Sequence, residues 1–242
     1  MRDYAKEFES RVNWINGYVS GAKAQGVMFG NSGGKDAALV GILCKHACAN
    51  TVGVIMPCQS KRNYGEDKTH AELLAEQYGI ETLVVDLTPA KEEIEKAVKV
   101  ADRDVLANVN PRLRMITLYA LAQERGCLVV GTGNLSEITM GYFAKYGDGG
   151  YDFNPIADLT ATEVKEFLTF LKAPEEIISK APSAGLWEGQ TDEQDLGMSY
   201  KELDAYILTG KATPEIKEKV EIAKVRTAHK RNTPAMYKTL DK

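Results

Sequence analysis

A glycine-rich turn between an apolar run and a helical pattern is the segment of this 242-residue chain best suited to chemistry. It reads Gly30-Asn31-Ser32-Gly33-Gly34-Lys35-Asp36-Ala37 and follows an apolar run at 27–29. Such a turn directs successive backbone N–H groups at one point, and the following helix adds about half a positive charge there. We therefore expect the phosphates of a nucleotide. A Walker A loop is excluded, because Phe29 and Asp36 stand where it needs Gly and Ser or Thr.

Four short apolar runs alternate with helical patterns, and they would position this turn. The runs cover 27–29, 52–56, 82–86 and 128–131. Because this alternation is typical of βαβ units, we predict an α/β fold with a doubly wound parallel sheet and flanking helices. Ligands of such sheets bind beyond the carboxyl ends of the strands, where the glycine turn, Pro57-Cys58 and Thr132-Gly133-Asn134 would all lie.

The remaining segments divide into helices and long loops. We predict helices over 4–23, 67–78 and 214–230, and one that starts at Pro111 and ends at Gly126. The segments 141–155 and 180–197 are predicted to be irregular, and their aromatic residues argue against plain disorder. The length suits one well-buried core, so we expect a single domain over 1–242.

Composition limits the classes of partner. The formal net charge is −4 and no basic block occurs, so we expect neither nucleic-acid nor membrane binding. No apolar run reaches the ~20 residues that span a bilayer, and the charged start does not resemble a signal peptide, which predicts a cytoplasmic protein. The four cysteines show no metal spacing and are predicted to be buried free thiols.

Residues 32–36 resemble the pyrophosphate loop of the N-type ATP pyrophosphatases, Ser-Gly-Gly-x-Asp-Ser, with Ala37 in place of the last Ser. Five further segments resemble the NAD⁺ synthetases of that group, in the same order along the chain. They are NVNPRLRM at 108–115, GTGNLSE at 131–137, GYFAKYGDGGYD at 141–152, KAPSAGLW at 180–187 with GQTDE at 189–193, and AHKR at 228–231. Several spaced matches in order make chance a poor explanation.

The resemblance implies a Rossmann-like fold and a two-step ligase reaction. The nicotinate carboxylate of deamido-NAD⁺ attacks the α-phosphate of ATP, pyrophosphate leaves, and ammonia then displaces AMP to form the amide. ATP is the co-substrate and Mg²⁺ the cofactor. The resemblance also implies a homodimer whose deamido-NAD⁺ site straddles the two subunits. Because only about thirty residues precede the loop, we expect free ammonia, or ammonia from a separate partner, as the nitrogen source.

The resemblance assigns roles to individual residues. Asp36 and Glu137 match the magnesium ligands, and with Lys35 and Asp152 they form the predicted catalytic set. The residues expected to bind ATP are Gly30, Asn31, Ser32, Gly33, Gly34, Lys35, Asp36, Ala37, Thr132 and Ser183. Those expected to bind deamido-NAD⁺ are Arg112, Lys145, Asp152, His229 and Lys230. Simpler interpretations remain open: an acidic residue at a helix N-terminus for Asp36, a solvated helix face for Glu137, and cations at a helix C-terminus for 229–231.

Two positions depart from the common pattern of the family. Ala37 lacks a hydroxyl, and Ala161 stands where many members have a lysine that contacts ATP. We hypothesise that the ammonium of Lys35 approaches the phosphates and partly replaces the missing charge. Two alternatives remain: another ATP pyrophosphatase that adenylates a different substrate, and a nucleotide-binding regulator that has lost turnover.

Overall fold

A four-stranded parallel sheet forms the centre of the computed structural model, which describes residues 2–181 and 191–237. The strands are β1 (Gly26–Gly30), β2 (Thr51–Ile55), β3 (Glu81–Val84) and β4 (Cys127–Val130), in the order β3-β2-β1-β4. Each predicted apolar run coincides with a strand to within two residues at either end. The parallel pairing of β1 with both β2 and β4 confirms the predicted α/β class.

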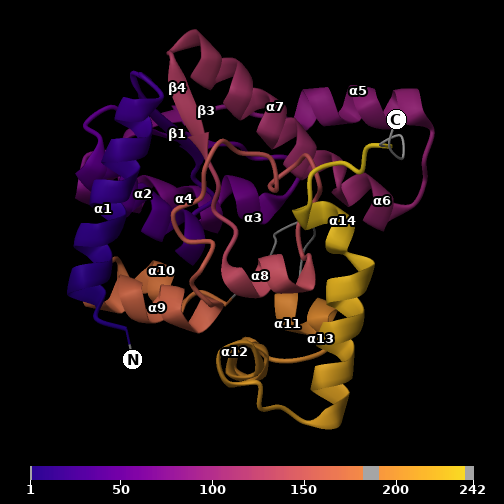
Figure 1. Cartoon of the computed structure of the whole chain (residues 1–242). Helices are drawn as coiled ribbons and strands as arrows, with labels where there is room; N and C mark the ends of the chain where they lie inside the picture. Colours follow the sequence, from indigo (N-terminus) through magenta and orange to yellow (C-terminus); the bar gives the residue numbers. More distant parts are fainter. Residues whose placement is uncertain (1, 182–190, 238–242) are drawn as a thin grey trace, which may run out of the picture.

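Helices connect and cover the strands (Figure 1). Up to β4 they are α1 (Tyr4–Gly21), α2 (Lys35–Ala47), α3 (Lys61–Tyr64), α4 (Glu66–Tyr78), α5 (Thr88–Val98), α6 (Arg103–Ala107) and α7 (Val109–Glu124). After β4 they are α8 (Leu135–Met140), α9 (Ala161–Phe170), α10 (Glu175–Ser179), α11 (Asp192–Leu196), α12 (Tyr200–Thr209), α13 (Pro214–Arg226) and α14 (Ala228–Arg231). In the described ranges, no helix is long and apolar enough to cross a membrane.

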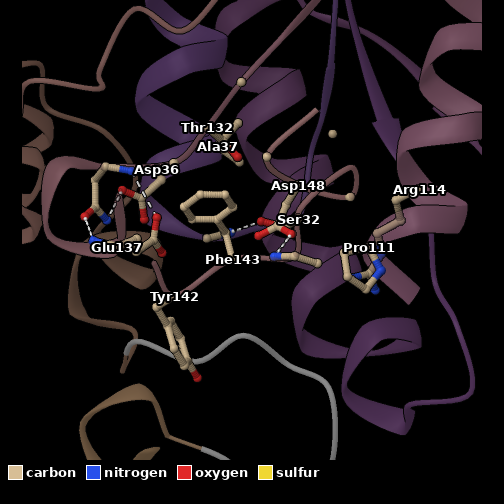
Figure 2. Close-up of a pocket in the computed structure, with 18 of the residues that line it drawn as sticks. Ser32, Asp36, Ala37, Pro111, Arg114, Thr132, Glu137, Tyr142, Phe143 and Asp148 are labelled. Atoms are coloured by element: carbon tan, nitrogen blue, oxygen red, sulfur yellow. Dashed lines mark hydrogen bonds between the residues drawn. The ribbon is translucent and has the colours of Figure 1, made fainter. Parts of the chain in front are cut away.

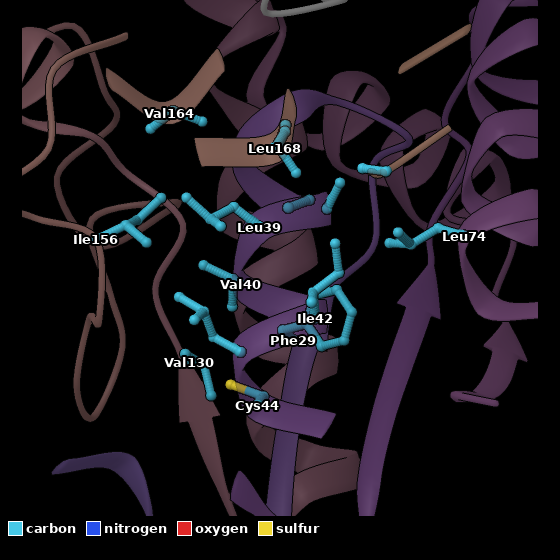
Figure 3. Close-up of a cluster of buried hydrophobic side chains, with 14 of the residues drawn as sticks. Phe29, Leu39, Val40, Ile42, Cys44, Leu74, Val130, Ile156, Val164 and Leu168 are labelled. Carbon is cyan, nitrogen blue, oxygen red and sulfur yellow. The ribbon is translucent and has the colours of Figure 1, made fainter. Parts of the chain in front are cut away.

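The two faces of the sheet bury separate apolar clusters. Phe29 of β1 packs with α2, α4 and α9 in the larger cluster, which Figure 3 shows around Leu39 and Ile42. Met28, the residue between Val27 and Phe29, points to the other face and packs with α7. Successive side chains of β1 are therefore buried on opposite faces, as a doubly wound sheet requires.

Several predicted boundaries differ from the structure. The helix predicted to start at Pro111 starts at Val109, because proline fits the first turn of a helix and need not open it. The helix predicted over 214–230 is broken at Thr227, and the predicted irregular stretch 180–197 contains α11. Of the cysteines, Cys48 is only partly buried, whereas the other three are buried and all four are free.

Helices α11, α12 and α13 form a further layer beyond the carboxyl ends of the strands. A separate apolar cluster joins α8, α12 and α13 through Met140, Leu203 and Val220. Figure 1 shows this layer below the sheet, with α8 between it and the strands. The layer closes one side of the space into which β1 and β4 point.

Candidate active site

The glycine turn lies at the carboxyl end of β1 and opens α2. Gly34 is the N-cap of α2, and no side chain of the described residues caps this end. The first N–H groups of α2 are therefore available to an anion in the adjoining pocket. Buried Asn31 fixes the preceding backbone, since its Nδ2 donates to the Ala71 carbonyl at 3.0 Å and its own N–H donates to the Val54 carbonyl at 2.9 Å.

Gly33 is the position in the turn that excludes a side chain. Its φ is +68°, a left-handed conformation that favours glycine. A Cβ atom there would lie 2.1 Å from the backbone carbonyl oxygen of Asp67, whereas one on Gly34 would meet only the Ser32 Oγ, at 3.3 Å. The turn thus packs directly on α4, which sets its shape.

Asp36 and Glu137 lie together in this pocket, one from α2 and the other from α8 (Figure 2). Asn134 connects them, because its Nδ2 donates to Asp36 Oδ1 at 3.0 Å and its backbone N–H donates to Glu137 Oε2 at 3.0 Å. The Glu137 N–H donates in return to Asn134 Oδ1 at 3.0 Å, which completes a capping box at the start of α8. Two helix N-termini therefore direct their first-turn carboxylates to one place.

The electrostatics of this pair favour a cation. Burial, and then the neighbouring charge of Asp36, raise the pKa of Glu137 well above its ordinary value. Burial also raises the pKa of Asp36, against the hydrogen bond from Asn134 that favours its ionised form. Repulsion between like charges is relieved by a bound cation, and two carboxylates are a usual protein contribution to a Mg²⁺ site. Across the described part of the chain, no group of three His, Cys, Asp or Glu side chains could hold a metal.

Two lysines connect the turn to the segment that follows α10. The Lys35 Nζ donates to the carbonyl oxygen of Lys180 at 2.5 Å. The Lys180 Nζ donates to the carbonyl oxygen of Gly33 at 3.1 Å and pairs with Asp67 at 2.6 Å. Burial lowers the pKa of Lys35. Both ammonium groups thus lie beside the glycine turn, although each already has a protein acceptor.

The pocket is large enough for a nucleotide, at about 870 Å³. Arg114 reaches it from α7 and donates to the Met56 carbonyl at 3.3 Å and to Asn63 Oδ1 at 3.1 Å. Burial lowers the pKa of this guanidinium. Asp148 faces the same pocket and accepts from the Ala144 N–H at 2.8 Å. Figure 2 shows the Phe143 ring between the Asp36–Glu137 pair and these two groups.

The structure brings together only some of the predicted site residues. Those that line the pocket are Gly30, Asn31, Ser32, Gly34, Lys35, Asp36, Ala37, Thr132, Glu137 and Lys230. Those that do not line it are Gly33, Arg112, Lys145, Asp152 and His229. Ser183 lies outside the described residues.

The predicted residues outside the pocket have other local partners. The Arg112 Nη1 donates to the Asn108 carbonyl of its own helix at 3.0 Å, and Lys145 donates to the His229 carbonyl at 2.5 Å. Asp152 accepts from the Val129 N–H at 2.7 Å and from the Tyr119 hydroxyl at 3.1 Å, beside edge strand β4. Arg112 and Asp152 are exposed to solvent and Lys145 is partly exposed.

The basic cluster 229–231 contains the helix-capping arrangement considered above. The Lys230 Nζ donates to the carbonyl oxygens of Gly141 and Phe143 at 2.8 and 2.7 Å, just after α8. Arg231 donates to the Ile138 carbonyl at 3.0 Å and also to the Lys224 carbonyl. These two cations therefore complement the C-terminal ends of α8 and α13, and Lys230 also lines the pocket.

Sequence reasoning gave no role to three residues that the structure places in the pocket: Lys180, Arg114 and Asp148. All three lie inside the segments that carry the family resemblance, next to residues that did receive roles. Position within those motifs was the available signal. The hydrogen-bond partners of these residues could not be predicted from the motifs.

The chain is similar to known proteins over most of its length. The NAD synthase family matches residues 7–240. An NH₃-dependent NAD⁺ synthetase from Carboxydothermus hydrogenoformans is 42% identical over 238 residues, which cover 96% of this chain and 97% of that protein. The solved NMN synthetase from Francisella tularensis is similar at a TM-score of 0.94 and 32% identity, covering 99% of this chain and 100% of that one. The NH₃-dependent NAD synthetase from Campylobacter jejuni, solved with a nitrate ion, is similar at a TM-score of 0.82 and 27% identity. The match covers 98% of this chain and 100% of that one.

These matches span nearly the whole length of the proteins compared, and the solved structures share the parallel sheet with its flanking helices. They extend through the glycine turn, α8 and the basic cluster, so they include every segment described above. The chain belongs to the NAD synthase family, whose members are ligases that form a carbon–nitrogen bond.

Proposed function

We propose that this chain amidates the nicotinate carboxylate of deamido-NAD⁺ with ammonia, at the expense of ATP, in the cytoplasm. The observation that carries the proposal is the Asp36–Glu137 pair, which Asn134 joins beside an anion-binding glycine turn. A glycine turn that can hold pyrophosphate, next to two carboxylates that could hold Mg²⁺, would suit cleavage of ATP between its α and β phosphates. The extent of the family match supports the same reaction.

The first step would transfer the adenylyl group. A carboxylate oxygen of the substrate attacks the α-phosphorus, the bond to the bridging oxygen breaks, and pyrophosphate leaves with its charge. The N–H groups that open α2 are fixed by the fold, so they can stabilise that charge without reorganising during the step. Lys180 lies beside the same turn and would add positive charge there.

The second step would form the amide. The nitrogen of ammonia attacks the acyl carbon, AMP leaves, and the excess proton passes to a base. Asp148 is the carboxylate that we assign to this proton, because it lines the pocket and its side chain is accessible. Asp36 and Glu137 would hold Mg²⁺, which when bound neutralises phosphate charge, and phosphate oxygens and water would complete its ligands.

The homodimer is also part of the proposal. Arg112, Lys145, Asp152 and His229 lie outside the pocket of one chain, as expected if they serve a site shared with a partner. Helix α7 exposes 59% of Ile116, an apolar side chain that a partner could cover. Mixing Asp36→Asn with Arg112→Ala tests this arrangement, because random dimers would regain about a quarter of the wild-type rate if each site uses both chains. Recovery of no activity would contradict it.

A second acceptor is supported by a specific observation. The solved NMN synthetase matches this chain at a TM-score of 0.94, against 0.82 for the solved ammonia-dependent NAD synthetase. Amidation of nicotinate mononucleotide would use the same adenylation chemistry without the AMP half of the dinucleotide.

One assay tests the reaction and separates the acceptors. Pure protein is incubated with ATP, Mg²⁺ and an ammonium salt, together with either deamido-NAD⁺ or nicotinate mononucleotide. We expect AMP, pyrophosphate and NAD⁺ with the first acceptor, at a higher kcat/KM than with the second. The opposite preference would assign the mononucleotide, and nucleotide binding without AMP formation would indicate a regulator.

A further inference from the structure

A second cavity, of about 680 Å³, lies beside the nucleotide pocket. The loop after β2 and helices α3, α5 and α6 surround it, and Ala107 lines both cavities. We propose that this second cavity binds a diphosphate group outside the nucleotide pocket. The identification of the ligand as pyrophosphate rests on the proposed function. The existence of an anion site is argued from the charges and contacts of the second cavity.

The charged side chains of the second cavity favour an anion. Four cations and two carboxylates line it, a net charge of +2 in a protein of net charge −4. These side chains are Lys61, Arg62, Lys91, Arg103, Glu66 and Glu95. They come from four different helices, so the excess of positive charge is produced by the fold and not by one basic stretch of sequence.

Two of these cations, Lys91 and Arg62, are less exposed to solvent than surface lysines and arginines usually are. Lys91 is only 7% exposed, and its Nζ is paired with Glu95 Oε1 at 3.5 Å, beyond the length of a good charge-assisted hydrogen bond. The Arg62 Nε is buried and makes no hydrogen bond within the described ranges, and its charged neighbours are Asp67 at 3.3 Å and Glu66 at 3.8 Å. Its N–H can therefore still donate to an oxygen of a ligand or of solvent in the second cavity.

The second cavity is connected to the glycine turn through one carboxylate. Asp67 Oδ1 accepts from the Lys180 Nζ at 2.6 Å, and Lys180 also donates to the Gly33 carbonyl. The same oxygen pairs with Arg62, which faces the second cavity. A diphosphate released at the turn would therefore lie close to the cations of the second cavity, because Asp67 contacts both Lys180 and Arg62.

The test is calorimetric titration of inorganic pyrophosphate into the full chain at low ionic strength, with the nucleotide pocket filled by α,β-methylene-ATP. We expect pyrophosphate still to bind, and Lys91→Met and Lys61→Gln each to weaken this binding about tenfold. Lys96→Gln is the matched control, because Lys96 lies on the same helix, pairs with Glu93 and does not line the second cavity. Lys61 is exposed, so its variant gives a result even if Lys91→Met does not fold.

Each outcome decides the proposal. Loss of all pyrophosphate binding once the analogue is bound, or equal binding by the two cavity variants and the control, would overturn it. ADP titrated in the same way distinguishes the source of the diphosphate, since tighter binding of ADP assigns a nucleotide in place of free pyrophosphate. If α,β-methylene-ATP does not bind, the proposed function fails. The second cavity is then tested in the absence of the analogue, by whether Lys91→Met and Lys61→Gln weaken pyrophosphate binding.

Discussion

Replacing Asp36 by asparagine should stabilise the ligand-free protein while it removes activity. The substitution keeps the shape of the side chain, and the amide oxygen can still accept from the Asn134 Nδ2, which lies 3.0 Å from Asp36 Oδ1. It removes one of two like charges in a partly buried site. Two unit charges 4 Å apart repel by about 4 kcal/mol in a protein environment, and solvent in the pocket reduces this, so we expect a gain of about 1–3 kcal/mol near neutral pH.

The pKa shifts of the two carboxyls determine how the stability difference between Asp36→Asn and the wild type changes with pH. Folding raises the pKa of both Asp36 and Glu137, so the folded chain holds protons that the unfolded chain releases above about pH 4. Their contribution to wild-type stability is therefore lost as the pH rises through the raised pKa values. At low pH both carboxyls are neutral and the variant should match the wild type, and the difference should grow as the pH increases.

Thermal unfolding in EDTA across this pH range measures the effect, at about 2–4 °C per kcal/mol for a chain of this size. Asp86→Asn is a control of opposite sign, because hydrogen bonds from Tyr64 and Thr88 lower the pKa of Asp86 and its loss should destabilise the protein as the pH rises. Adding Mg²⁺ should raise the Tm of the wild type more than that of Asp36→Asn. A variant no more stable than the wild type at neutral pH, or a pH-independent difference, would refute the reasoning.

Three further substitutions test the turn and its neighbours. Gly33→Ala should abolish ATP binding, because its Cβ would lie 2.1 Å from the Asp67 carbonyl oxygen, whereas Gly34→Ala should keep it; calorimetry with ATP compares the two. Asn134→Ala should weaken Mg²⁺ binding about 10–100-fold, because it removes the side-chain hydrogen bond to Asp36 and disturbs the backbone hydrogen bond to Glu137. Titration of activity with Mg²⁺ measures the effect. Lys35→Gln should lower the turnover number at saturating ATP, since it removes positive charge beside the turn, and an unaltered rate would discard the hypothesis for this lysine.

The fold was predictable because its signals are local. Each strand is a short apolar run, and Gly79 ends α4 in the left-handed conformation that glycine favours, with φ at +63°. The start of α7 was less predictable, because Pro111 is compatible with several positions in a first helical turn. The break at Thr227 depends on tertiary contacts, since its hydroxyl donates to the Met140 carbonyl as well as within its own helix.

The sequence motifs predicted which residues lie in the site, but not the hydrogen bonds and packing that position them. The motifs supplied Asp36 and Glu137, and parallel strands meeting at one edge explain why they lie together. The motifs could not show that Asn134 joins them, because that contact spans 98 residues. Likewise, Arg112 and Asp152 belong to matching segments, yet their place outside the pocket depends on how α7 and β4 pack.

Ala37 and Ala161 are the two positions that depart from the common pattern of the family. Both line the pocket, so a hydroxyl at position 37 and a cation at position 161 would each lie beside it. Lys35 supplies an ammonium in the same pocket, and its Nζ is held by the Lys180 carbonyl while Lys180 reaches back to the Gly33 carbonyl. Because each lysine anchors the segment that carries the other, a change in either should disturb both. We therefore expect the charge at Lys35 and the shape of the turn to be coupled, so that a double substitution of Lys35 and Lys180 costs less than the sum of its parts.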